Sequence, residues 1–290
     1  MSTVEVSPLW PAELDHMRIE SPDPEALADF YRRALGMAVV PIDEATSLLD
    51  ASGRRFIIGR GASRGHPWSA FALADGAQLA RYRHYLRDRG VALLPSPSPL
   101  FDASAFAVCD PDERLAVFGL ARTDTSSPAL LPGRLQHIVV ASERFPAMMA
   151  FYRDVLGFLV SDTVHVDDGN GGLGEPNVCF LRANLAHHSF AVFRAPRSVS
   201  DHFALDVPSW DDIRLWADHF AALEIPIWWG PGRHGAGNNL FFMAKDPDGN
   251  NIEISAELEE IPKGEPGKRW PAGGRALNLW GPAWVRDTVG

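Results

Sequence analysis

The sequence predicts an α+β protein of two domains, each made of two βαβββ modules. The main observation is an internal repeat, because ELDHMRIESPDPEALADFYRRALGMAVV, which starts at Glu13, matches RLQHIVVASERFPAMMAFYRDVLGFLVS, which starts at Arg134. A second observation is a further strand–helix–strand pattern downstream of the repeat in each half of the 290-residue chain. A third is that each half ends in strands around a DPD turn. Together they predict four copies of one module.

The repeat defines the first module of each half. Each copy begins with an alternating strand that contains a histidine, passes through a polar turn into a helix that ends in FYR-x-x-LG, and returns as a strand. His16 aligns with His137, and Gly36 aligns with Gly157. A left-handed cap after the last helical turn favours a residue without a β-carbon. We therefore expect the two helices to end next to these glycines.

The second modules start with SAFALADGAQLARYRHYLRDRGVALLP at Ser69 and with DHFALDVPSWDDIRLWADHFAALEIPIWWG at Asp201. They close around the turns DPD at Asp110 and DPDG at Asp246. Between the halves, ARTDTSSPALLPG has the Ser, Thr and Pro content of a linker. The predicted parts are an N-terminal domain without a metal site, a linker, a C-terminal catalytic domain and a C-terminal extension, at residues 1–122, 123–133, 134–262 and 263–290.

Composition argues against some partners and locations. The formal net charge is -10, and no cluster of Lys and Arg is present to attract nucleic acid or an anionic membrane. Cys109 and Cys179 lie in apolar, strand-like settings and are too few for a disulfide framework or a thiolate metal site. No apolar run reaches the roughly 20 residues that span a bilayer, and no targeting segment is recognisable. We expect a cytoplasmic protein.

Glu253 stands between two isoleucines in a strand-like segment, where a carboxylate is costly unless it is paired or holds a metal. His137 and His202 lie on the first strands of the two modules of the same half, so sheets curled around one cavity would bring all three residues together. Two histidines and one carboxylate with open positions beside them are typical of a mononuclear non-haem Fe(II) centre. A lone strand histidine is more often a satisfied core residue, and only the joint placement favours the metal.

The first half provides an internal control. His16 is kept, but Ala70 stands at the position assigned to His202, and Val117 follows Asp110 by the same spacing that separates Glu253 from its own DPD turn. If these ligands served only the stability of the fold, both halves should keep them. The sequence therefore predicts one active site, in the second half.

These residues, together with the stretches GPGRHGAGNN and DPDGNNIEI, resemble the vicinal oxygen chelate superfamily and, within it, the two-domain type I extradiol catechol dioxygenases. The resemblance covers nearly the whole chain and is strongest from Leu135 to Ile254. It implies the vicinal oxygen chelate fold, aromatic compound catabolism, a catechol-type substrate, dioxygen as co-substrate and a homo-oligomer. It also implies Fe(II) as cofactor, with His137, His202 and Glu253 as its ligands; Mn(II) accepts the same ligands.

The resemblance also implies two catalytic histidines. His188 fits the family pattern His-x-x-Ala on the strand before the second ligand, and strand alternation would place its neighbour His187 on the opposite face. His234 matches the histidine that bonds the phenolic oxygen of the substrate, although a solvated loop histidine is the simpler interpretation. Met243 stands where the family carries a tyrosine, and a methionine donates no hydrogen bond.

Several features bear on the substrate. Ser161 to Pro176 is expected to form a mobile polar loop, and Trp228-Trp229 is a candidate aromatic wall. Valine at position 139 offers no group for a substrate carboxylate, which favours a hydrophobic or polycyclic catechol. The C-terminal extension is expected to fold over the site or over a subunit contact. Two alternatives remain open: a non-oxidative metal-dependent isomerase or lyase of the same superfamily, and a ligand-sequestering binding protein.

Overall fold

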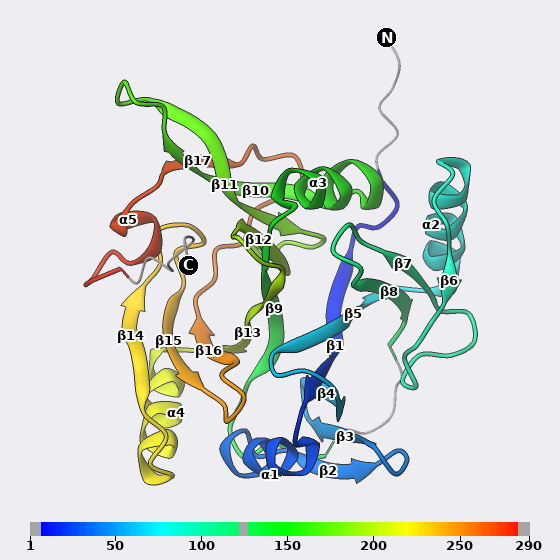
Figure 1. The fold of residues 1–290 in the computed structure, drawn as a ribbon, viewed down its shortest axis with the longest axis vertical. Coiled ribbons are helices and arrows are strands. Elements are labelled where there is room, and N and C mark those ends of the chain that lie inside the picture. Colours follow the sequence, from blue (N-terminus) through cyan, green and yellow to red (C-terminus); the bar gives the residue numbers. More distant parts are fainter. Residues whose placement is uncertain (1–6, 122–126, 284–290) are drawn as a thin grey trace.

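The computed structural model describes residues 7–121 and 127–283. Within these ranges the chain forms two halves, each built on one sheet whose helices lie on the outside (Figure 1). Positions 123–126 of the predicted linker, and residues 1–6, 122 and 284–290 of the other predicted parts, lie outside the described residues. None of the described helices combines the length and apolar character that a membrane crossing requires.

The predicted order of four βαβββ modules is confirmed. The first module contains β1 (Ala12–Ser21), α1 (Pro24–Ala34), β2 (Ala38–Pro41), β3 (Thr46–Ala51) and β4 (Arg54–Arg60). The second contains β5 (Gly65–Leu73), α2 (Gly76–Asp88), β6 (Leu94–Pro95), β7 (Phe106–Cys109) and β8 (Leu115–Leu120).

The second half repeats this arrangement. Its first module contains β9 (Arg134–Ser142), α3 (Phe145–Ala150), a π-helical continuation (Phe151–Leu156), β10 (Leu159–Asp167), β11 (Leu173–Arg182) and β12 (Phe190–Arg194). Its second contains β13 (Val199–Val207), α4 (Trp210–Ala222), β14 (Ile227–Arg233), β15 (Leu240–Lys245) and β16 (Asn251–Ala256). The chain continues into β17 (Lys268–Pro271) and α5 (Gly274–Leu277).

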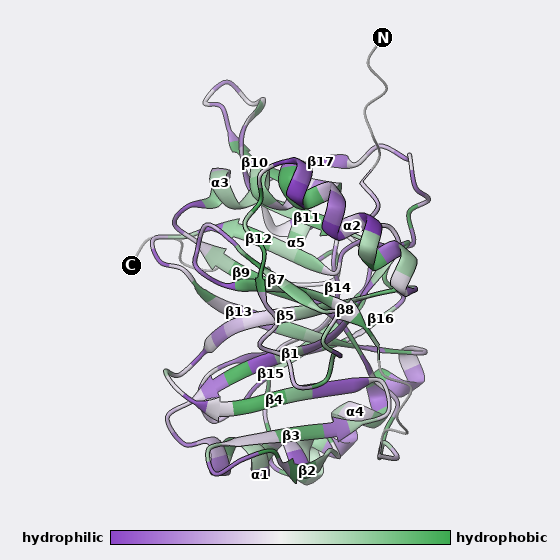
Figure 2. Cartoon of the chain, turned by 90° about the vertical axis from the view of Figure 1, so that its right-hand side faces the viewer, coloured by the Kyte–Doolittle hydropathy of each residue, from purple (hydrophilic) through white to green (hydrophobic). Residues whose placement is uncertain are grey.

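Local sequence explains where the helices begin and end. The Asp23 carboxylate caps α1 by accepting the Ala26 N–H, and the side chain of Ser209 caps α4 by accepting the Asp212 N–H. Gly36 and Gly157 have φ of 61° and 83°, so both predicted left-handed caps are confirmed. The helix α2 carries both hydrophilic and hydrophobic residues on the outside of the molecule (Figure 2), as expected of a helix that buries one face.

The two sheets have matching strand orders, which are β2-β3-β4-β1-β5-β8-β7-β6 and β14-β15-β16-β13-β9-β12-β11-β10-β17. In each sheet the first strands of the two modules pair antiparallel at the centre, as β1 with β5 and β9 with β13. The last strand of the second module then pairs in parallel with the first strand of that module. This arrangement brings three strands from both modules of one half side by side, where the candidate ligands lie.

In the second half, one sequence expectation is wrong and one strand was not foreseen. The segment from Ser161 to Pro176 is not a loop, because most of it belongs to the paired strands β10 and β11, which form a projecting hairpin (Figure 1). The β-branched residues Val164 and Val166 alternate with polar residues and support β10. The C-terminal extension also contains a strand that the sequence did not suggest, since β17 pairs in parallel with β10.

The two halves are joined by a reciprocal pair of contacts between repeated elements. The Tyr31 hydroxyl donates to Asp246 Oδ2 at 2.7 Å, and the Tyr152 hydroxyl donates to Asp110 Oδ2 at 3.3 Å. Each tyrosine belongs to the FYR motif of one half, and each aspartate opens the DPD turn of the other half. Burial raises the pKa of Asp110 to about 6 and also raises the pKa of Asp246. The repeated FYR and DPD motifs therefore have a structural role between the halves.

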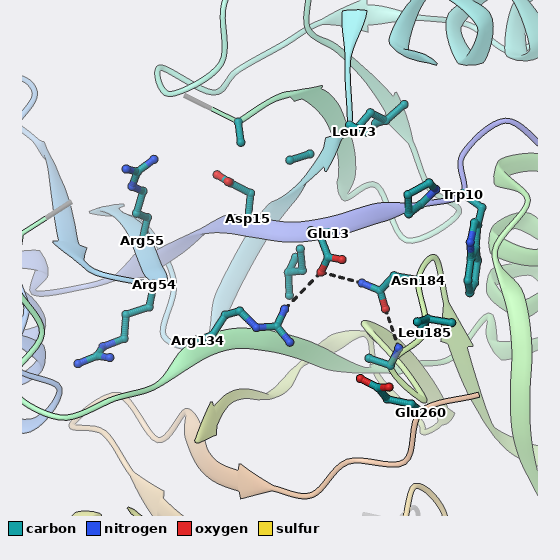
Figure 3. A pocket seen from close by; sticks show the side chains of 17 residues that line it. Trp10, Glu13, Asp15, Arg54, Arg55, Leu73, Arg134, Asn184, Leu185 and Glu260 are labelled. Carbon is teal, nitrogen blue, oxygen red and sulfur yellow. Dashed lines mark hydrogen bonds and ion pairs between the residues drawn. The ribbon is translucent and has the colours of Figure 1, made fainter. Parts of the chain in front are cut away.

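A cleft of about 960 Å³ lies at the junction of the halves (Figure 3). Glu13 bridges it by accepting from Arg134 at 3.3 Å and from Asn184 Nδ2 at 2.8 Å. No candidate metal ligand lines this cleft. Its charged residues instead include the ion pair of Glu13 with Arg134, which crosses the junction.

The reciprocal contacts make a stability prediction. Tyr31→Phe should lower the free energy of unfolding by about 2 kcal/mol, because it removes a short buried hydrogen bond to a carboxylate. Tyr152→Phe is the matched control and should cost about 1 kcal/mol or less, because its bond is longer. Denaturant unfolding followed by circular dichroism measures both values. Equal losses, or no loss for Tyr31→Phe, would contradict the assigned contacts.

Candidate metal centre

Three candidate ligands meet on adjacent strands of the second sheet. His137 lies on β9, His202 on β13 and Glu253 on β16, and their ligand atoms all lie within 4.8 Å of one another. Glu253 Oε2 is 3.3 Å from His202 Nε2 and 3.9 Å from His137 Nε2. All three side chains are buried. The structure therefore brings together the three residues that the sequence singled out.

Strand register explains how they converge. Ala204 on β13 is the pairing partner of both His137 and Glu253, and His202 lies two residues before Ala204. Side chains two residues apart on a strand point to the same face. All three ligands therefore project from one face of the sheet into the same cavity.

The register also corrects the comparison between the halves. In the first sheet, His16 pairs with Ala70 and Ala70 pairs with Val117, so Ala70 corresponds to Ala204. The structural counterpart of His202 is Trp68, two residues earlier than the sequence suggested. A two-residue shift leaves every side chain on the same face of the sheet, so the alternating pattern could not reveal it. The assignments of His16 and Val117 were right.

The corresponding space in the first half is filled with side chains. His16 Nε2 lies 2.6 Å from Ser98 Oγ and its Nδ1 lies 2.5 Å from Asp15 Oδ1. The surrounding cluster is apolar and consists of Ile57, Trp68, Ala70, Ala72, Phe101, Ala105, Ala107 and Val117. In the described part of the chain, only the second half holds a group of three side chains that could bind a metal ion.

Each candidate ligand is oriented through an atom that would not face the metal. The supporting contacts are His202 Nδ1 to Asp201 Oδ2 at 2.6 Å, His137 Nδ1 to Gln136 Oε1 at 3.3 Å and Asn239 Nδ2 to Glu253 Oε1 at 2.9 Å. Such contacts fix the rotation of a ligand and the position of its hydrogen. None of these three supporting residues was predicted from the sequence. The available signals were the glycine-rich stretch around Asn239 and the positions of Gln136 and Asp201 directly before His137 and His202.

The electrostatics of the cluster suit a cation. Burial lowers the pKa of His137, although Glu253 opposes the shift. Burial acts to raise the pKa of Glu253, but its contacts with His137 and His234 hold that pKa well below the usual value. Neutral imidazole and ionised carboxylate are the forms that bind a metal.

The paired histidines precede β12 and are not on a strand, which corrects the alternation argument. His187 N–H donates to Glu259 O, whereas Ser189 N–H donates to Leu181 O, so the backbone turns away from a regular ladder between them. His188 lines the cavity, with its ring centroid 4.1 Å from that of His137. Burial holds the pKa of His188 well below its usual value. His187 points toward Asp162 instead, with 3.2 Å between Nε2 and Oδ2.

His234 is packed in the cavity wall, which contradicts the interpretation of a solvated loop histidine. Its ring stacks on Phe241 with centroids 3.7 Å apart, and its Nδ1 donates to the Leu277 carbonyl. Its Nε2 lies 3.8 Å from Glu253 Oε1. His234 therefore adds a second non-ligand imidazole to the site.

The cavity beside the ligands has a volume of about 150 Å³ and a mostly apolar wall. Met243 is buried, pairs with Glu253 across β15 and β16, and lines this cavity. Of the tryptophan pair, Trp229 lines it. The C-terminal extension contributes Ala272, Gly273, Ala276 and Leu277, so it folds over the site as expected.

Comparison with known proteins agrees with this geometry. Residues 134–254 match the model of the Glyoxalase/Bleomycin resistance protein/Dioxygenase superfamily. The chain is 29% identical to metapyrocatechase 2 of Cupriavidus necator, over 95% of this chain and 92% of that protein. It is 28% identical to the iron-dependent extradiol dioxygenase of Rhodococcus jostii (strain RHA1), over 92% of this chain and 95% of that protein.

Among solved structures, the chain is similar to the Mn(II)-bound glyoxalase from Novosphingobium aromaticivorans. The TM-score is 0.77 and the identity is 26%, covering 96% of this chain and 93% of that chain. These findings confirm the predicted family resemblance and the vicinal oxygen chelate fold.

The site predicts a clear difference between two histidines. His202→Ala should lose metal after anaerobic loading with Fe(II) and desalting, because it removes one of three ligands. His16→Gln, at the repeat-equivalent position of His137 in the first half, should retain about one metal per chain. Elemental analysis measures the metal, and circular dichroism checks the fold. Stoichiometric metal in folded His202→Ala would contradict the ligand assignment.

Proposed function

We propose that this protein is an extradiol (meta) ring-cleaving dioxygenase. Its residues 134–254 match the Glyoxalase/Bleomycin resistance protein/Dioxygenase superfamily. It would insert both atoms of dioxygen into a catechol-type aromatic. The observation that carries the proposal is the buried cluster of His137, His202 and Glu253 on one face of a sheet, beside an apolar cavity. The names of the two curated relatives support the same chemistry.

The donor set fits a mononuclear Fe(II) centre. Two imidazole nitrogens and one carboxylate oxygen leave coordination positions open, and each ligand is already oriented by a neighbouring polar group. When bound, the metal would lower the pKa of the catechol hydroxyls and offer positions for substrate and dioxygen. Mn(II) accepts the same donors, and the Mn(II)-bound structural neighbour keeps that metal as the alternative.

Two imidazoles beside the cluster have separate tasks in this proposal. His188 is neutral because it is buried, so it can accept a proton from a substrate hydroxyl and return it later in the reaction. His234 donates its Nδ1–H to the Leu277 carbonyl, so Nε2 is the ring nitrogen left to face the phenolic group of a substrate. Neither task needs the tyrosine hydroxyl that Met243 replaces.

The cavity favours a hydrophobic or polycyclic catechol. Val139, Phe180 and Trp229 line it, and the C-terminal extension covers it with further apolar side chains. Arg194 is a cation on the lining, but its guanidinium lies over the Phe145 ring, 5.2 Å from the centroid. We therefore propose a substrate whose ring substituent is uncharged.

A metal-dependent isomerase or lyase is the second candidate. The similarity to a solved glyoxalase favours it, and so does Met243, which leaves the site without a tyrosine hydroxyl. The full ligand set lies within one half of the chain and a neutral histidine stands beside it, which favours the dioxygenase.

Direct turnover tests the proposal. Protein loaded anaerobically with Fe(II) should consume one dioxygen per catechol cleaved and form a yellow ring-opened product when air is admitted. An oxygen electrode and absorbance spectroscopy measure both quantities with a panel of unsubstituted, alkyl, aryl and carboxylated catechols. We expect the alkyl and aryl compounds to give the highest kcat/KM. Catechol binding without oxygen uptake would contradict the dioxygenase proposal and favour the isomerase or binding function.

His188→Ala should bind metal and substrate but turn over at least about 100-fold more slowly, because a positioned acid–base group is lost. The control is His84→Ala, since His84 lies on the exposed side of α2 with 77% of its side chain accessible. Steady-state kinetics and metal content are measured for both variants. A kcat for His188→Ala equal to that of the control would remove His188 from the mechanism.

A further inference from the structure

A buried row of polar side chains runs from the cavity toward the C-terminal extension. His188, His187 and Asp162 are 4%, 0% and 0% exposed. We infer that Asp162 and His187 are positioning residues, which fix the hydrogen of His188 on Nδ1 and leave its Nε2 free to accept a proton. The catalytic consequence rests on the proposed function, but the tautomer itself does not.

Asp162 is the fixed end of the row. Its Oδ1 accepts the Lys268 backbone N–H at 2.9 Å, and its Oδ2 accepts the Trp270 indole N–H at 2.7 Å. The same Oδ2 lies 3.2 Å from His187 Nε2, which is an ion-pair distance, although the direction of the N–H does not allow a hydrogen bond between them. An ionised carboxylate only accepts hydrogen bonds. When His187 carries a single ring hydrogen, attraction to this carboxylate places that hydrogen on Nε2.

The contact between the two histidines then determines which ring nitrogen of His188 carries the hydrogen. His187 Nδ1 and His188 Nδ1 are 3.0 Å apart, so one must donate and the other must accept. Because the hydrogen of His187 is held on Nε2 by Asp162, its Nδ1 is the acceptor. His188 Nδ1 must then carry the hydrogen, and the lone pair of His188 is left on Nε2.

Packing holds the two rings in this arrangement. The centroid of the Phe180 ring lies 5.3 Å from that of the His187 ring and 5.0 Å from that of the His188 ring. Gly237 has φ of 83°, and a β-carbon there would lie 3.2 Å from His187 Nδ1. A side chain at this position would press on the nitrogen that accepts from His188. The geometry is therefore set from both sides of His187.

The row also gives the C-terminal extension a role in the site. Both residues that bind Asp162 besides His187 belong to β17, which lies in this extension. The extension therefore holds the carboxylate that orients the histidines, in addition to covering the cavity.

The alternative is that the row only satisfies buried polar groups. Nitrogen-detected NMR of histidine side chains in the metal-free full-length protein separates the two explanations. In the wild type, His188 should carry its hydrogen on Nδ1. A hydrogen on Nε2 would overturn the inference, whatever the protein catalyses.

Two variants of His187 sharpen the test. His187→Phe keeps a planar ring but removes the acceptor, so His188 should shift toward the Nε2–H tautomer. His187→Asn can place its amide oxygen near the position of Nδ1, so the wild-type tautomer should be kept. An unchanged tautomer in folded His187→Phe overturns the inference. If His187→Phe does not fold, the wild type and His187→Asn still test the inference. The Nε2–H tautomer of His188 in either protein would contradict it.

Kinetics test the catalytic consequence. With a catechol that the wild type cleaves, His187→Phe should lower kcat at least about tenfold and change KM less than about twofold, and His187→Asn should recover most of kcat. An unchanged kcat for His187→Phe would overturn the positioning role. A wild type that cleaves no catechol would instead overturn the proposed function. The NMR experiment would still test the tautomer of His188 independently.

Discussion

The carboxylate of Glu253 is the constraint on which the second half of the molecule depends. A charge with 1% of its side chain exposed is costly inside a sheet unless strong partners surround it. Asn239 binds one of its oxygens, and imidazoles of His137, His202 and His234 lie within 4 Å of one or the other. Neighbouring polar groups fix those imidazoles in turn. A cation bound to Glu253 would add to the contacts with protein groups that offset the cost of burying this charge.

The first half shows how the same fold is stabilised without that charge. Val117 takes the place of Glu253, Trp68 takes the place of His202, and an apolar cluster fills the space between them. His16 remains, but Asp15 and Ser98 satisfy its two nitrogens. The FYR and DPD motifs are kept in both halves because each tyrosine binds the aspartate of the other half. Repeat-equivalent residues thus divide into those that serve the fold and those that serve one site.

Much of this could be predicted from the sequence because periodicity and repetition carry it. The four modules, the glycine caps and the convergence of His137, His202 and Glu253 all follow from patterns of alternation and spacing. The equivalence of Trp68 and His202 could not be found, since a two-residue slip preserves the face of every side chain. The row from Asp162 to His188 was also hidden, because β17 binds Asp162 from a segment 106 residues away and lacks a strand pattern of its own.

X-ray absorption at the metal edge of Fe(II)-loaded protein tests the central claim most directly. The account predicts two imidazole ligands and otherwise oxygen donors in the wild type, and loss of the bound iron from desalted His202→Ala. A spectrum with oxygen donors alone, or one unchanged by His202→Ala, would show that the metal binds elsewhere and would contradict the account of Glu253 and its neighbours.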